Sequence, residues 1–226
     1  MRICVIIPAY NEAENIGAVV AGARRFIEDV AVVDDGSTDD TAAKAKGAGA
    51  ILLEHKVNQG KGVALKTGFD YALEKDYDAV ITLDADGQHD SGEIPQFIEA
   101  AREADVVVGT RAGNRAGMPL IRRATNTISS WILSGLSGER LTDTQSGYRL
   151  IKTRVLKMAK TKTAGFEAES EILLEAIGRG FRVVEIPIRT IYGRVKSHYK
   201  WWQAFLFLGL AVRYFFKKPP YLKKRG

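Results

Sequence analysis

The sequence of 226 residues has a single cysteine and no apolar stretch long enough to span a bilayer. One cysteine excludes a disulfide within the chain, and Cys4 lies inside an apolar run, so we expect a core residue in a reducing compartment. Only five apolar residues follow Met1 and Arg2 before Pro8, too few for the core of a secretory signal. These absences together predict a cytoplasmic protein.

Two glycine-rich fingerprints of nucleotide-binding proteins are also missing. The chain has no G-x-x-x-x-G-K-[ST] segment, and no G-x-G-x-x-G follows its first apolar run. This excludes a P-loop NTPase and an ordinary dinucleotide-dependent dehydrogenase.

Acidic residues are absent from the C-terminal segment. Residues 186–226 contain ten Lys or Arg and no Asp or Glu, whereas the remaining 185 residues carry 23 basic and 27 acidic side chains. The net charge of +6 therefore belongs entirely to this segment. A basic tail is typical of proteins that bind an anionic membrane surface or nucleic acid. Because the tail lacks a recognised nucleic-acid fold signature, we expect no nucleic-acid partner.

The most informative stretch that is present is Val80–His89, which reads VITLDADGQH. Four strand-favouring residues lead directly to Asp84 and Asp86, so both carboxylates are expected at the carboxyl end of a buried strand. Ligands of open α/β sheets bind at that edge. Paired carboxylates there favour Mg²⁺ or Mn²⁺, which proteins hold with one or two carboxylates plus substrate phosphates. The alternative is that these residues only cap turns and helices, as Asp often does after a strand.

The rest of the chain predicts alternating strands and helices. We expect strands at residues 2–7, 30–33, 51–53, 79–83, 105–108 and 182–186. We expect helices at residues 13–28, from about 39 (with Ser37 or Thr38 as N-cap), 62–73, 93–102, up to about 136, and 166–177. This order gives βαβ units and a mostly parallel sheet in an α/β fold with three layers. The loops after the first, second and fourth strands should meet at one edge.

We expect one domain at residues 1–200 and an appendage at 201–226. Residues 201–216 read WWQAFLFLGLAVRYFF, with polar side chains on one side of a helical projection and aromatic and leucine side chains over most of the rest. Such a C-terminal amphipathic helix suits a membrane interface. Its alternatives are packing on its own domain or on a second subunit, which would make a homodimer.

Five motifs in order resemble family 2 glycosyltransferases of the GT-A fold, and especially the dolichyl-phosphate (polyprenyl-phosphate) mannose synthases. The motifs are PAYNE at 8–12, VDDGSTD at 33–39, NQGKG at 58–62, LDADGQH at 83–89 and DTQSGYR at 143–149. The resemblance covers nearly the whole chain. It implies a three-layer α/β/α sandwich of the GT-A type and an inverting, metal-dependent transfer of a hexose from GDP-mannose or a UDP-hexose to a polyprenyl phosphate. It also implies a peripheral position at the cytosolic face of the membrane.

The resemblance also implies roles for individual residues. The nucleotide-sugar residues are Pro8, Tyr10, Glu12, Asp35, Asp84, Ala85, Arg194 and Ser197. The metal residues are Asp84, Asp86 and Gln88. The acceptor-phosphate residues are Arg111, Arg122, Arg123 and Asn126. The residues closest to the chemistry are Asp86, Arg111 and Asp143. The sequence departs from the family at His198, where a Lys is expected after Ser197, so Arg194, Lys196 or Lys200 are alternative cations and His198 is an alternative metal ligand.

Several interpretations stay open. Asp143 suits a base for a hydroxyl acceptor, but also a turn-forming side chain. Lys61 suits a phosphate contact or a solvated lysine at a helix start. His89 is better explained as a loop residue than as a ligand, and His55 as structural or exposed. The competing functions are the same fold with UDP-glucose or another donor and a soluble or protein acceptor, an Asp-X-Asp phosphatase of the haloacid-dehalogenase type, and a nucleotide-binding module.

Overall fold

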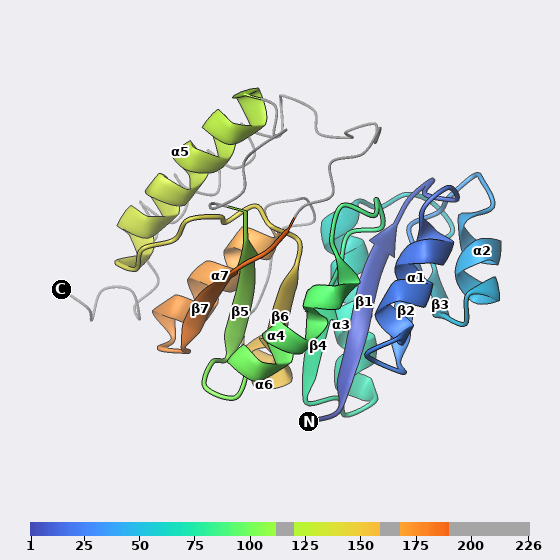
Figure 1. The fold of residues 1–226 in the computed structure, drawn as a ribbon, viewed down its shortest axis with the longest axis horizontal. Helices are drawn as coiled ribbons and strands as arrows, with labels where there is room; N and C mark the ends of the chain where they lie inside the picture. The colour runs from blue at the N-terminus through green and yellow to red at the C-terminus, as the bar shows by residue number, and fades with distance from the viewer. Residues whose placement is uncertain (112–119, 159–167, 190–226) are drawn as a thin grey trace.

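A computed structural model describes residues 1–111, 120–158 and 168–189, and these residues form a seven-stranded sheet flanked by helices (Figure 1). The strands are β1 (Ile3–Ala9), β2 (Val30–Asp34), β3 (Ile51–Glu54), β4 (Ala79–Thr82), β5 (Val106–Thr110), β6 (Arg149–Lys152) and β7 (Val183–Pro187). The helices are α1 (Ile16–Arg24), α2 (Thr41–Gly47), α3 (Lys61–Glu74), α4 (Ile94–Ala100), α5 (Leu120–Ser137), α6 (Thr153–Met158) and α7 (Ala168–Gly178). A 3-10 turn, η1 (Ser91–Glu93), leads into α4.

The strand order is β3-β2-β1-β4-β6-β5-β7. All neighbours are parallel except β6, which runs antiparallel to both β4 and β5. Since β1, β2 and β4 are parallel and adjacent, the loops after them leave the sheet at the same edge. The expected mixed α/β fold with a mostly parallel sheet is therefore confirmed.

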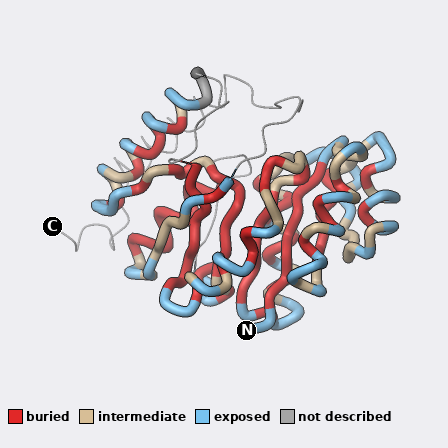
Figure 2. Tube along the Cα trace, in the orientation of Figure 1, coloured by how far each residue is buried: buried red, intermediate tan, exposed pale blue. Residues whose placement is uncertain are grey.

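The sheet separates two hydrophobic cores, which makes the three expected layers. Val- and Ile-rich strands present alternate side chains to the two faces, so Cys4 and Ile6 enter one core while Val5 and Ile7 enter the other. Helices α3, α6 and α7 cover the first face, and α1, α2 and α4 cover the second. The inner strands β2, β1, β4, β6 and β5 are buried along most of their length (Figure 2), as expected of a sheet covered on both faces, whereas the edge strands β3 and β7 are partly exposed. Cys4 is fully buried in the first core, as predicted, and this burial raises the pKa of its thiol to about 12.

Several expected boundaries were wrong. Strand β1 continues through Pro8 and Ala9, which we expected in a loop. Proline is tolerated there because β4 pairs with β1 only as far as Ile6, so Pro8 has no neighbour on that side that needs its missing N–H. Helix α1 is shorter than predicted, and helix α6 was not predicted.

The N-cap of α2 was also wrong. It is Asp40, because the Ser37 and Thr38 side chains bond Asp34 and Asn11 instead.

No helix among the described residues is both long and apolar enough to cross a bilayer. The tail at 201–226, together with Arg194, Ser197 and His198, lies outside the described residues, so the expectations for it stay predictions.

Candidate active site

The loops after β1 and β2 are bonded into one surface at the sheet edge. The backbone N–H of Asn11 donates to Ser37 Oγ (2.9 Å), and that of Thr38 donates to Asn11 Oδ1 (2.8 Å). Asn11 has φ +54°, a left-handed conformation that Asn adopts more readily than most residues. Tyr10, next to it, keeps a side chain 40% exposed at this edge. The PAYNE and DDGST motifs therefore meet, as the sequence predicted.

Asp84 lies at the centre of a cluster of charged side chains that follows β4. We call Lys61, Asp84, Asp86, His89 and Glu169 the aspartate cluster. Asp84 Oδ1 accepts from Lys61 Nζ at 2.6 Å, and Asp84 Oδ2 lies 3.1 Å from His89 Nε2. Burial alone would raise the pKa of Asp84. The charge of Lys61 and the contact with His89 nevertheless hold this pKa well below its usual range. Asp84 is therefore an ionised carboxylate, and with a side chain 26% exposed it can be reached from solvent.

Asp86 differs from Asp84 because its charge is poorly compensated. Burial, and then the nearby charge of Asp84, raise the pKa of the Asp86 carboxyl. Its Oδ1 accepts the backbone N–H of Gln88 at 3.0 Å, and no described residue donates to its other oxygen. A divalent cation fits this environment, because it would relieve the repulsion between the two carboxylates and bind the remaining oxygen. Within the described ranges, however, no three His, Cys, Asp or Glu side chains are grouped closely enough to hold a metal by themselves. Any such ion would need ligands from the substrate.

Within the cluster, Lys61 connects Asp84 to Glu169, a residue that the sequence did not single out. Its ammonium lies 3.3 Å from Glu169 Oε2, so it bridges the end of β4 and the start of α7. Burial alone would lower the pKa of Lys61, but the Asp84 and Glu169 carboxylates raise it. Lys61 is thus a paired, largely buried cation, and its interpretation as a solvated lysine was wrong. No sequence signal distinguished Glu169 from an ordinary acidic residue in the first turn of a helix.

The backbone of Gly147 packs closely against the Asp84 carboxylate. A Cβ placed on Gly147 would lie 2.6 Å from both oxygens of the Asp84 carboxylate, closer than real contacts allow. The DTQSGYR motif therefore needs glycine at this position because β6 brings its backbone against the aspartate. This explains how two motifs 60 residues apart come to share one site.

Arg111 and Asp143 form a second charged unit, which we call the arginine pair. Asp143 accepts from the Arg111 backbone N–H (3.0 Å), Nε (2.7 Å) and Nη2 (2.8 Å). Both side chains are almost fully buried. Burial alone would raise the pKa of Asp143, but Arg111, with further help from a hydrogen bond from Asn126, lowers it. A carboxylate whose pKa is lowered in this way is a poor base, and Asp143 does not act as a turn former. The geometry of Asp143 instead favours a role in orienting the Arg111 guanidinium.

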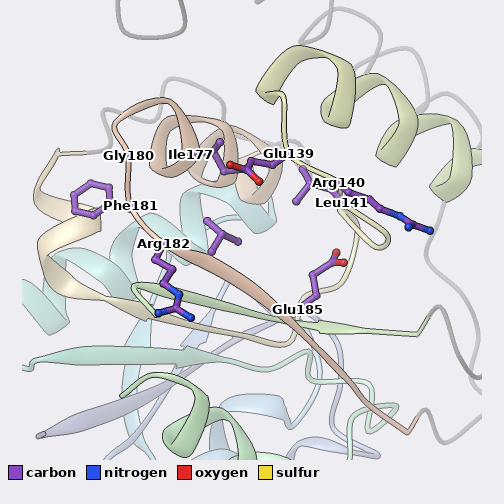
Figure 3. A pocket seen from close by; sticks show the side chains of 9 residues that line it. Glu139, Arg140, Leu141, Ile177, Gly180, Phe181, Arg182 and Glu185 are labelled. Carbon is purple, nitrogen blue, oxygen red and sulfur yellow. The ribbon is translucent and has the colours of Figure 1, made fainter. Parts of the chain in front are cut away.

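Glu185 on β7 supports the arginine pair from behind. Its carboxylate accepts the backbone N–H groups of Thr142 (2.8 Å) and Asp143 (3.1 Å) and the Thr142 hydroxyl (2.7 Å). In Figure 3 the Glu185 side chain points from β7 toward the loop that carries Leu141. The same residue lines a hollow of about 380 Å³ between the loop after α5 and the segment that joins α7 to β7, and no residue of the aspartate cluster lines it. This hollow therefore lies apart from the aspartate cluster.

Arg149 fixes, by hydrogen bonds, the loop between the arginine pair and the aspartate cluster. Its side chain is buried and donates to the backbone carbonyls of Ser146 (2.8 Å) and Thr144 (2.8 Å), and also to the carbonyl of Glu169. The turn that carries Asp143 and the first turn of α7 are thus tied to one cation. The motif residue Arg149 is structural in this position.

Asp35 was predicted to contact the nucleotide, and both of its carboxylate oxygens accept hydrogen bonds from the protein. It accepts the backbone N–H groups of Gln59 (2.9 Å) and Gly60 (2.7 Å), and its Oδ1 lies 2.7 Å from His55 Nδ1. His55 in turn contacts Thr67 Oγ1 at 2.9 Å, so it is structural and buried. Asp35 thereby fixes the turn that starts α3 and places Lys61.

The structure brings together most of the predicted site. Pro8, Glu12, Ala85 and Gln88 lie at the same sheet edge as the aspartate cluster, and Asn126 reaches the arginine pair from α5. Arg123 is exposed on α5, and the Arg122 side chain is outside the described part. Which of these residues touch a substrate stays a prediction.

The model of the family described as "Glycosyl transferase family 2" matches residues 4–164, well over half of the chain. Relatives over most of the length include the undecaprenyl-phosphate mannosyltransferase of Micrococcus luteus, 31% identical over 83% of this chain and 83% of the relative. The polyprenol monophosphomannose synthase of Mycolicibacterium smegmatis is 32% identical over 83% of this chain and 76% of the relative.

A third relative has a different donor in its name. The UDP-N-acetylglucosamine–dolichyl-phosphate N-acetylglucosaminyltransferase of Methanococcus voltae is 33% identical over 84% of this chain and 86% of the relative. Among solved structures, glucosyl-3-phosphoglycerate synthase from Mycobacterium tuberculosis with Mn²⁺, UDP-glucose and phosphoglyceric acid superimposes with a TM-score of 0.72 over 96% of this chain and 79% of that chain. At 20% identity this likeness shows the fold alone.

Proposed function

The chain belongs to glycosyl transferase family 2, and from that premise we propose that it transfers a hexose, most simply mannose, from a nucleotide sugar to a polyprenyl phosphate. The observation that carries the proposal is the aspartate cluster at the carboxyl end of β4, where a divalent ion fits beside Asp86. The shared lipid-phosphate acceptor in the names of three relatives supports the acceptor class. Membership of a glycosyltransferase family argues against the phosphatase and binding-module alternatives.

The donor is assigned to the edge formed by β1, β2 and β4. Pro8, Tyr10, Glu12, Asp35, Asp84 and Ala85 surround this edge and are the proposed nucleotide-sugar residues. Arg194 and Ser197 complete the proposed donor set from outside the described residues. The exposed ring of Tyr10 suits contact with a base, and the ionised Asp84 suits hydroxyl donors of a nucleotide. Because Asp35 already accepts two backbone N–H groups, we propose that it shapes this edge through the turn before α3.

Asp86 and Gln88, with Asp84 nearby, are the residues proposed to hold Mg²⁺ or Mn²⁺. When bound, such an ion stabilises the negative charge of the nucleoside diphosphate that leaves the sugar. The side chains already contribute a cation of their own, because Lys61 neutralises Asp84 and so limits the repulsion between this edge and an incoming diphosphate.

The acceptor is assigned to the arginine pair and the start of α5. Arg111 is held rigid by Asp143, and its planar guanidinium suits a phosphate. Arg122, Arg123 and Asn126 are the further proposed acceptor residues. A lipid phosphate is already anionic at neutral pH, so the site needs to orient it rather than remove a proton. We propose in-line attack with inversion at the sugar carbon, as the resemblance to the family implies.

Donor identity is the part of the proposal that an experiment must decide. We would mix the protein with Mn²⁺, a short polyprenyl phosphate and labelled GDP-mannose, UDP-glucose or UDP-N-acetylglucosamine in separate reactions, and count label in the organic phase. We expect counts from one donor that are lost in Asp86→Ala. Absence of organic counts, with nucleotide still released, would reject the lipid acceptor in favour of a soluble or protein acceptor.

We also propose that the basic C-terminal segment brings the protein to the cytosolic face of a membrane. Ten cations without an acid in residues 186–226 support this, since each adds about 1 kcal/mol near an anionic leaflet. The protein should sediment with anionic vesicles and be released by salt. Retention in the supernatant would instead favour the tail as a dimer contact.

A further inference from the structure

We propose that Glu169 is a specificity residue that accepts a hydrogen bond from a hydroxyl group of the donor hexose. This inference rests on the proposed function, because it names what a residue of the same site recognises. Glu169 lies in the first turn of α7, and its side chain is only 7% exposed. Its Oε2 contacts Lys61 Nζ, while no group in the described part of the chain donates to its Oε1.

The position of Glu169 is tightly defined from two sides. Its backbone carbonyl accepts from Arg149, the same guanidinium that binds the carbonyls of Thr144 and Ser146. Its side chain is held by Lys61, which is held in turn by Asp84. A carboxylate anchored in this way does not rotate freely in search of a partner. Its second oxygen is therefore a preformed acceptor.

A buried acceptor without a donor is destabilising, so a merely structural role does not explain it. Arg149 is a strong donor that binds the backbone of Glu169, yet its hydrogen bonds go to backbone carbonyls and not to this carboxylate. Lys61 would be retained by Asp84 alone, which it contacts at the shorter distance of 2.6 Å. The unused oxygen is what remains to be explained, and a ligand with a hydroxyl donor satisfies it.

Charge and distance identify which part of the substrate would supply that donor. The Lys61 ammonium contacts two carboxylates, those of Asp84 and Glu169, and one cation cannot neutralise both. The remaining negative charge disfavours a phosphate at Glu169 but not a neutral hydroxyl. Glu169 is separated from Asp84 only by the Lys61 ammonium, at 3.3 and 2.6 Å. In a nucleotide sugar the hexose follows the diphosphate directly. A carboxylate two hydrogen bonds away from the diphosphate-side aspartates is thus placed to meet the sugar.

The test is a cycle that combines Glu169 variants with donors lacking one hydroxyl. Wild-type protein and Glu169→Ala would be assayed for kcat/KM with the accepted nucleotide sugar and with its 2-, 3-, 4- and 6-deoxy forms. A hydroxyl bonded to a charged acceptor contributes roughly 10- to 100-fold. For one of the deoxy donors, we expect the kcat/KM of the wild-type protein to fall by that factor. Removing the same hydroxyl should lower the kcat/KM of Glu169→Ala by less than about threefold. If Glu169→Ala keeps the full wild-type sensitivity to every deletion, the inference is overturned.

Calorimetric binding without acceptor provides a second readout that does not depend on turnover. Titrations with GDP, GDP-mannose, UDP and UDP-glucose compare the nucleotide with its sugar conjugate. We expect Glu169→Ala to bind the nucleoside diphosphate within about threefold of wild type, and to lose the extra affinity that the hexose adds. Equal losses for both ligands, or a hexose that adds no affinity in wild type, would overturn the inference.

Two further variants keep these outcomes interpretable. Glu175→Gln changes another buried acid of α7, one that pairs with Arg179 at 3.0 Å, and should behave as wild type in both assays. Glu169→Gln keeps the shape and a contact for Lys61, so it replaces the alanine variant in the same cycle if that protein does not fold. If wild type labels no lipid phosphate, the proposed function fails, whereas the binding comparison still decides the role of Glu169.

Discussion

The arginine pair and the aspartate cluster lie at the same edge of the sheet, yet they are built in opposite ways. In the pair, Asp143 accepts three bonds from Arg111 and is fully buried, and Glu185 holds the backbone of the same turn. In the cluster, Asp84 is partly exposed, and both Asp86 and Glu169 keep an oxygen to which no described residue donates. One unit is satisfied by the protein, and the other keeps oxygens without a donor among the described residues.

This difference separates positioning from binding. Satisfied buried charges rigidify a structure, whereas strained and uncompensated charges mark places where function conflicts with stability. We therefore expect changes in the pair to reduce stability and changes in the cluster to reduce activity. Each prediction below tests that division.

The largest expected effect on activity comes from Asp86→Asn. Transfer should fall roughly 100- to 1,000-fold, because the substitution removes the carboxylate that we propose holds the divalent ion. The free energy of unfolding at neutral pH should rise by about 1 kcal/mol, because the repulsion from Asp84 disappears. Label transfer and thermal unfolding without divalent ions measure the two effects. A clear loss of stability would instead show that Asp86, like the arginine pair, is satisfied by the protein.

The largest expected effect on stability comes from Asp143→Asn. The free energy of unfolding should fall by roughly 3–5 kcal/mol, because the Arg111 guanidinium is left buried without its carboxylate. Urea unfolding measures this loss. The double substitution Arg111→Met with Asp143→Leu should restore most of the stability but not the transfer activity. If Asp143→Asn unfolds like wild type, the pair is not the rigid unit described above.

The loss of unfolding free energy in Asp143→Asn should depend on pH, because the pKa of Asp143 is lowered in the folded protein. An acid with a lower pKa in the folded than in the unfolded protein stabilises the fold above its unfolded pKa, about 3.9, and this contribution disappears as pH falls through the folded pKa. The difference between wild type and Asp143→Asn should thus be complete above about pH 5 and shrink below about pH 4. Urea unfolding at pH 7, 5, 4 and 3 measures it, and a difference that persists undiminished at pH 3 would contradict the ion pair.

A smaller effect is expected from Gly147→Ala, which tests the contact between the cluster and β6. The new methyl group would press on the Asp84 carboxylate at 2.6 Å, so kcat/KM should fall about tenfold or more as the aspartate moves away from Lys61. Gly135→Ala is the matched control, because a Cβ there has nothing within 4 Å and the position lies inside α5. It should leave transfer unchanged and stabilise the protein by up to about 1 kcal/mol. Equal activity of both variants would remove Gly147 from the site.

The smallest expected effect comes from Glu185→Ala. Loss of the acceptor for Thr142 and Asp143 should destabilise the protein by about 1–2 kcal/mol and lower kcat/KM severalfold, because the turn that orients Arg111 loosens. Glu185→Gln keeps one oxygen and should recover part of both. Loss of stability without any change in kcat/KM would limit Glu185 to a structural role.

Much of the fold could be predicted because it depends on local patterns. Apolar runs such as residues 79–83 and 105–108 identified strands, and their alternation with helices predicted a parallel sheet. The antiparallel direction of β6 was not predictable, because a short apolar segment does not indicate in which direction its strand runs in the sheet. Pro8 was misplaced in a loop because its tolerance depends on where β4 stops pairing with β1.

The site divides in the same way. The Asp84–Asp86 motif is contiguous and follows its strand, so the sequence by itself determined that two carboxylates stand at the sheet edge. The partners of those residues come from distant segments: Lys61 joins Asp84 to Glu169, and Arg111 meets Asp143. Only the tertiary structure decided which charges are neutralised and which oxygens remain available. The physical reason is that ion pairing and desolvation depend on distances in space, which the order of residues does not contain.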